Sequence, residues 1–154
     1  MKRVTLDNWV ANRWLERLDS DADEVRRLLR TADAYLADYQ KAVEAGQSAD
    51  AQLDFAYGAA RACATAALRA AGYRVVRGGS EHYRTFQALE FSIDPEKKIT
   101  PTLDKLRKKR NIGAYDDRGL VSQVEADHCG KVALLMRKQV EDWIRATHPE
   151  KLAK

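Results

Sequence analysis

Apolar side chains recur every three or four residues along most of the chain, the spacing that places them on one face of an α-helix. This pattern predicts helices over 8–18, 21–45, 49–71, 81–91, 102–111 and 123–147. The segment 73–77 is short and β-prone, and we expect an extended connection there rather than a strand. Because loops of modest length join the helices, we expect an all-α fold, an up-down helical bundle of four to five main helices.

Residues suited to helix ends stand at the borders of these segments. Before a helix, a serine hydroxyl can accept a hydrogen bond from a free backbone amide. A serine precedes each of four predicted helices: Ser20, Ser48, Ser80 and Ser122. Glu125 should complete a capping box with Ser122. Thr100 followed by Pro101 is typical of a helix start.

The predicted helix 49–71 is rich in small side chains. One face of it holds Leu53, Tyr57, Ala60, Ala64 and Ala67. Small side chains let neighbouring helices approach closely, because the side chains at the contact set the distance between helix axes. We therefore expect this helix to be the central element of the bundle.

Composition agrees with a single globular domain. The chain has 154 residues, 45% hydrophobic and 32% charged, which is enough to bury a sizeable core. We expect one domain over 1–154, with a core over about 48–147 and the N-terminal helices of 8–45 packed on it. No apolar run approaches the about 20 residues that span a bilayer, and none near the N-terminus has the length of a signal peptide. We therefore expect a cytoplasmic protein with no membrane contact.

The two cysteines, Cys63 and Cys129, each fall inside a helical apolar pattern. They are far apart in the sequence, and nothing has the ligand spacing of a structural zinc site. We therefore expect two buried thiols in a reducing compartment, and neither a metal nor a cofactor.

Positive charge is concentrated in one segment. The net charge of the chain is +4, whereas residues 97–118 hold eight basic and three acidic residues, a net of +5. Such a cluster is either a solvated face without a partner or a surface for an anion, and RNA is the obvious polyanion. The candidate RNA-binding residues are Lys105, Arg107, Lys108 and Lys109.

Candidate chemistry follows directly after this basic run, at Arg110, Asn111 and Tyr115. We expect the helix to weaken at Gly113 and the chain to turn at 116–117. When RNA is cleaved, the 2′-hydroxyl attacks the adjacent phosphorus, so an enzyme must hold the phosphate, stabilise its added charge and move a proton. Arg110 suits the first two tasks because a guanidinium donates bidentately to phosphate, and Asn111 could orient the phosphate or the ribose.

The order Arg110-Asn111 followed by Tyr115 resembles the Arg-x4-His signature of HEPN domains. Two further stretches resemble that family's long core helix and the start of the helix after it. These stretches are 54–74 and 79–89. The resemblance covers about 48–143. It implies a helical bundle and, for many members, a metal-independent endoribonuclease of a toxin–antitoxin or defence system.

The resemblance also implies partners. Members pair as homodimers in which the arginine motifs of two subunits face one cleft, so the cleft should attract an anion such as RNA. A cognate antitoxin or a nucleotidyltransferase-like protein is the expected second component.

This chain departs from the signature because Tyr115 stands where catalytic members carry histidine. An ordinary tyrosine pKa is near 10 and an ordinary histidine pKa is near 6.5, so tyrosine is the poorer base at neutral pH. Both RNA cleavage and RNA binding without turnover therefore remain open. His82 could face the same groove and replace the missing histidine, or it could be an exposed residue in the first turn of its helix.

Asp54 and Arg61 lie two helical turns apart and share a face. This pair is either a buried polar link or part of a pocket, together with His82. The alternative to an RNA-binding function is a non-catalytic interaction module whose basic face binds an acidic partner protein or a nucleotide.

Overall fold

The computed structural model describes residues 5–78, 80–115 and 119–153, and the side chains of 112–115 lie outside the described part. The all-α prediction is confirmed, because within this part helices dominate and only one two-stranded sheet occurs. The elements are α1 (Leu6–Ala11), β1 (Leu15–Arg17), α2 (Ala22–Glu44), α3 (Ala49–Ala70), β2 (Tyr73–Val75), α4 (Glu81–Gln87), α5 (Thr100–Tyr115) and α6 (Gln123–Thr147), with 3-10 turns at Ala88–Phe91 and Pro149–Lys151.

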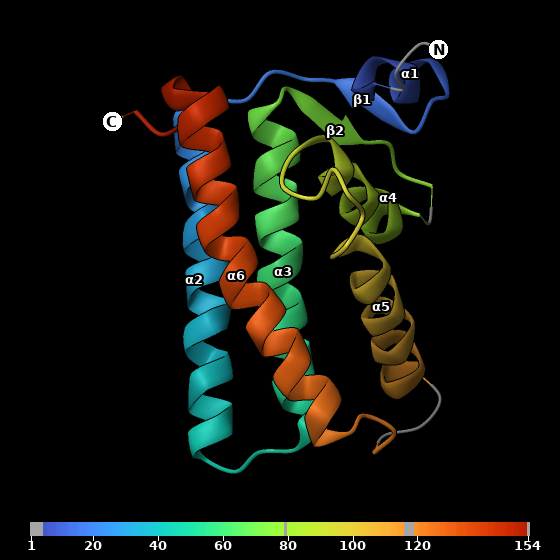
Figure 1. Ribbon diagram of the computed structural model, residues 1–154, viewed down its shortest axis with the longest axis vertical. Helices are drawn as coiled ribbons and strands as arrows, with labels where there is room; N and C mark the ends of the chain where they lie inside the picture. The colour runs from blue at the N-terminus through green and yellow to red at the C-terminus, as the bar shows by residue number, and fades with distance from the viewer. Residues whose placement is uncertain (1–4, 79, 116–118, 154) are drawn as a thin grey trace.

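Helix α3 is the central element, as its small side chains predict. It packs against α2 and α6 on one side and against α4 and α5 on the other (Figure 1). Fifteen of its 22 residues are buried. At Gly58 the helices approach so closely that an added Cβ would lie 2.7 Å from Cε1 of Tyr35 on α2.

Both cysteines are free and buried, on α3 and α6. Burial raises the pKa of Cys63 and of Cys129 to about 12. Both thiols therefore stay protonated at neutral pH, and the prediction that they are buried is confirmed.

The predicted helix 8–18 is wrong beyond Ala11. Arg13 adopts φ 63°, and the Trp14 amide donates to the Trp9 carbonyl at 3.0 Å, which closes α1 in a Schellman-type turn. The chain then forms β1, which pairs antiparallel with β2 in the register Leu15 to Val75. The segment predicted as an extended connection is therefore a strand.

Ser20 does not cap α2, contrary to the prediction. Asp21 is the N-cap and accepts from the Glu24 amide at 2.8 Å, while the Ser20 hydroxyl donates to the Arg69 carbonyl at 2.6 Å. The Arg69 guanidinium is buried, and it donates to the Leu18 carbonyl at 2.6 Å and to Glu24 at 2.8 Å. These contacts fasten the N-terminal segment to α3. Of the other predicted serine caps, Ser48 and the Ser122 capping box are confirmed, whereas Ser80 makes no capping hydrogen bond.

Thr100 is the first residue of α5 rather than its N-cap, and Asp94 caps the segment that leads into the helix. Its buried carboxylate accepts from the amides of Lys98, Ile99 and Thr100 at 2.8, 2.9 and 2.8 Å, and from the Thr100 hydroxyl at 2.7 Å. Burial tends to raise the pKa of Asp94, but these hydrogen bonds outweigh it and lower the pKa overall. The helix does not break at Gly113 but continues to Tyr115, and the predicted turn at 116–117 lies outside the described residues.

We expect Asp94→Ala to lower the free energy of unfolding by about 1–2 kcal/mol, because it removes the hydrogen-bond acceptor for the amides of Lys98 and Ile99, which precede α5, and of Thr100, its first residue. Chemical denaturation measures the loss. Hydrogen exchange should accelerate at the Lys98, Ile99 and Thr100 amides and stay unchanged near Ser48. Wild-type exchange at these three amides would contradict the assignment of Asp94 as the cap.

Candidate functional site

Helices α3, α4 and α5 bring together five side chains that we call the arginine–histidine cluster. It consists of Asp54, Tyr57 and Arg61 on one face of α3, His82 in the first turn of α4, and Arg110 on α5. Their spacing of three, four and seven residues places the three α3 side chains on consecutive turns. The pocket residues suggested by the sequence therefore lie beside the arginine of the motif.

Each ring nitrogen of His82 is within hydrogen-bond distance of a neighbour. Nδ1 lies 2.8 Å from the Tyr57 hydroxyl, and Nε2 lies 2.6 Å from Nη1 of Arg61. A guanidinium can only donate, so Nε2 must be the acceptor. The proton of the neutral ring is therefore on Nδ1, which donates to the Tyr57 oxygen.

The surroundings of His82 favour the neutral ring. Burial is the largest cause that lowers its pKa, followed by the positive charges of Arg61 and Arg110, and Glu81 opposes them weakly. Protonation would also turn Nε2 into a donor that faces a donor of Arg61. His82 is therefore neutral at pH 7, with its free electron pair on Nε2.

Tyr57 is the member of the cluster that the sequence pattern does not identify. The heptad spacing predicts it as a core residue, and its side chain is indeed buried, with 2% exposed. Burial raises the pKa of its hydroxyl to about 12, despite the opposing charges of Arg110 and Arg61. Its position between Asp54 and Arg61 on the same face is the signal that would have pointed to it.

Arg110 makes one long ion pair among the described residues. Its guanidinium carbon lies 5.2 Å from the centre of the Tyr57 ring, a cation–π contact. Nε lies 3.5 Å from Oδ1 of Asp54, which is too long for a good hydrogen bond. This nitrogen is buried and has no hydrogen-bond partner in the part of the chain that the structure describes.

The other predicted RNA-binding residues divide into two groups. Arg107 lies near the cluster: its guanidinium is 5.5 Å from the Tyr83 ring centre and contributes to the lowered pKa of His82. Arg107 and Lys108 both pair with Asp104, at 2.9 and 3.3 Å. The other two residues, Lys109 and Lys105, have different surroundings: Lys109 pairs with Glu125 at 3.6 Å, and Lys105 is exposed.

The other two residues of the predicted motif are Asn111 and Tyr115. Asn111 follows Arg110 and is partly buried. The Tyr115 side chain lies outside the described residues, although the backbone of α5 extends to it.

A pocket of about 210 Å³ lies between α4 and the first turns of α5, and its lining includes none of the five cluster residues. Its lining includes Tyr83 and Asp104, which both contact Arg107. The carboxylates of Glu90 and Asp104 also line it, and the pocket is therefore separate from the arginine–histidine cluster.

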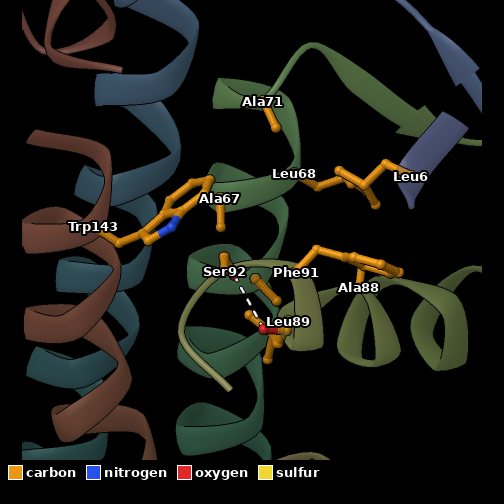
Figure 2. Close-up of a pocket in the computed structure, with 10 residues that line it drawn as sticks. Leu6, Ala67, Leu68, Ala71, Ala88, Leu89, Phe91, Ser92 and Trp143 are labelled. Carbon is orange, nitrogen blue, oxygen red and sulfur yellow. Dashed lines mark hydrogen bonds between the residues drawn. The ribbon is translucent and has the colours of Figure 1, made fainter. Parts of the chain in front are cut away.

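A second cavity can be set aside as a ligand site. Figure 2 shows it between Leu68 and Ala67 of α3, Phe91 and Trp143. Its volume is about 10 Å³, room for one water molecule at most. The lining carries no charged side chain, and the Ser92 hydroxyl in it donates to the Leu89 carbonyl at 3.3 Å.

Among the described residues, no group of three or more histidine, cysteine, aspartate or glutamate side chains could hold a metal ion. No helix in the same ranges is both long and apolar enough to cross a bilayer. Comparisons with protein families, curated proteins and solved structures found no match.

We expect the stability of the protein to fall as pH drops below about 6.5, in part because of His82. The folded state holds this ring at a lowered pKa, so the unfolded state binds the proton more readily, and its stabilising contribution is lost as pH falls through the folded pKa. The free energy of unfolding of His82→Gln, measured by denaturation at several pH values, should decline less steeply over this range. Equal slopes for the two proteins would contradict the neutral ring.

Proposed function

We propose that this chain is a HEPN-like RNA-binding protein in which the arginine–histidine cluster holds a phosphate of the RNA backbone. The observation that carries the proposal is the state of Arg110. Its guanidinium is fixed over the Tyr57 ring, and Asp54 offers it only a long ion pair. Among the described residues the Arg110 Nε has no hydrogen-bond partner, and a phosphate oxygen would supply one.

The positive groups around Arg110 suit an anion that has several oxygen atoms, such as phosphate. Arg61 and Arg107 bring two further guanidinium groups to the same region, and His82 adds no charge of its own. Asp54 is the one carboxylate that pairs with Arg110 among the described ion pairs, and its side chain is 55% exposed.

We extend the proposal to metal-independent RNA cleavage in a toxin–antitoxin or defence system, as the HEPN resemblance implies. Arg110 would hold the scissile phosphate and stabilise the charge that develops on it, and Asn111 would orient the ribose or phosphate. The resemblance also implies a homodimer with two such clusters facing one cleft. The cytoplasm is the compartment in which such a protein would meet its RNA.

A second function, docking of an acidic partner protein, has one observation in its favour. Leu120 and Val124 are 44% and 77% exposed, next to the Lys109–Glu125 ion pair at the start of α6. Exposed apolar side chains beside basic ones suit a protein surface better than an RNA strand. A cognate antitoxin or a nucleotidyltransferase-like protein would be such a partner.

Single-stranded RNA of mixed sequence should bind to the purified protein with an affinity that falls steeply as salt rises, because bound counterions are released. We expect Arg110→Ala to weaken binding at low salt about tenfold, roughly 1.4 kcal/mol, and to reduce the salt slope by about one. Fluorescence anisotropy titrations at several salt concentrations measure both quantities.

The matched control is Arg27→Ala, which removes the same charge from the exposed face of α2, across α3 from the cluster (Figure 1). This variant should bind RNA nearly as wild type does. Equal losses of RNA affinity in the two variants would mean that binding depends on net charge alone and not on the cluster. Absence of RNA binding at low salt, together with recovery of a stable complex with an acidic protein, would favour the second function.

A further inference from the structure

The two hydrogen bonds of His82 differ in how easily they can be exchanged. The Tyr57 hydroxyl is part of the core, since that side chain is 2% exposed. Arg61, on the opposite side of the ring, is an exposed residue. The Nδ1 side of the ring is therefore fixed, whereas the Nε2 electron pair is covered by a flexible, charged side chain.

A phosphate in the cluster would compete with His82 for Arg61. The guanidinium bonds a neutral imidazole through one nitrogen in the free protein, whereas a phosphate carries the opposite charge and can accept two parallel hydrogen bonds from arginine. When a backbone phosphate occupies the cluster beside Arg110, Arg61 gains more by turning to it. That movement uncovers the Nε2 electron pair at the position where the phosphate, and hence the adjacent ribose, is bound.

From this geometry we infer that His82 is the general base of RNA cleavage, released for its role when the substrate phosphate draws Arg61 away from Nε2. The inference rests on the proposed function. Nε2 takes the proton of the 2′-hydroxyl, the 2′-oxygen forms a bond to phosphorus, and the bond from phosphorus to the 5′-oxygen breaks. The leaving 5′-oxygen takes a proton from water, and His82 returns its proton to solvent. The products are a 2′,3′-cyclic phosphate and a 5′-hydroxyl.

The other described groups suit this role less well. The Tyr57 hydroxyl has a pKa of about 12 and remains protonated. His128 lies on the exposed face of α6, and His148 ends that helix against Trp143, with ring centres 5.3 Å apart. Tyr57 acts as a positioning residue because its buried hydroxyl lies 2.8 Å from Nδ1 and holds the ring in place.

The charged groups around His82 come from two helices besides its own. Arg61 faces it from α3, Arg107 and Arg110 act on it from α5, and Glu81 is its neighbour on α4. The three cations favour the neutral ring, so the base should be active down to a pH below 6.5.

The test follows release of 2′,3′-cyclic phosphate from a pool of RNAs of randomised sequence by the full-length protein, with a chelator present, between pH 4.5 and 8. Wild-type rates should rise through an apparent pKa below 6.5 and then level off. We expect His82→Gln to lose 100-fold or more in rate, a far larger loss than any it shows in RNA affinity. The matched control, His128→Gln, should cleave as wild type does, and circular dichroism confirms that each variant is folded.

A second variant separates a base from a merely structural histidine. Arg61→Ala removes a cation that lowers the pKa of His82, so the pH at which the rate levels off should move upward. A wild-type profile in either His82→Gln or Arg61→Ala would overturn the inference, and so would RNA binding by the wild type without release of cyclic phosphate. Those results leave the proposed RNA binding intact, whereas absence of RNA binding by the wild type ends both proposals.

Discussion

The chemistry of the cluster depends on one histidine held between a phenol and a guanidinium that the same helix supplies. Tyr57 and Arg61 are one turn apart on α3, and His82 bridges them from α4. Because arginine cannot accept a hydrogen bond, this arrangement alone fixes which nitrogen of His82 carries the proton. The fixed proton then leaves an electron pair on Nε2 beside three positive charges, which is the environment that the proposed phosphate binding and base catalysis require.

The fold holds these groups in place by means that lie outside the cluster. Helix α3 is buried along most of its length, so the Tyr57 side chain has little freedom. The start of α5 is fixed by the buried carboxylate of Asp94, and regular helix geometry then places Arg110 over the Tyr57 ring. The buried Asp94 carboxylate and the buried helix α3 together fix the position of the Arg110 guanidinium.

The periodic pattern of apolar residues predicts α2, α3 and α6 nearly to their ends, because packing of one face dominates the stability of long helices. It also places Asp54 and Arg61 on one face. The pattern does not predict features that depend on distant residues or on unusual backbone angles. Examples are the left-handed Arg13 that ends α1 and the carboxylate of Asp94, which binds Thr100 from six residues away. A third is the Tyr57 hydroxyl, which contacts His82 although the pattern identifies Tyr57 only as a core residue. Charge counting likewise overstates the basic surface, because carboxylates pair with most of its cations in the folded chain.

The most direct test of the account is the protonation state of His82, read from the ring nitrogens by two-dimensional ¹H–¹⁵N NMR at pH 7, with His82→Gln used for assignment. The account predicts a proton on Nδ1 and an electron pair on Nε2 in the free protein. An RNA strand with 2′-O-methyl sugars, which cannot be cleaved, should shift the Nε2 resonance as Arg61 leaves it. A ring protonated on both nitrogens or on Nε2 alone, or one that does not respond to the strand, would contradict the account.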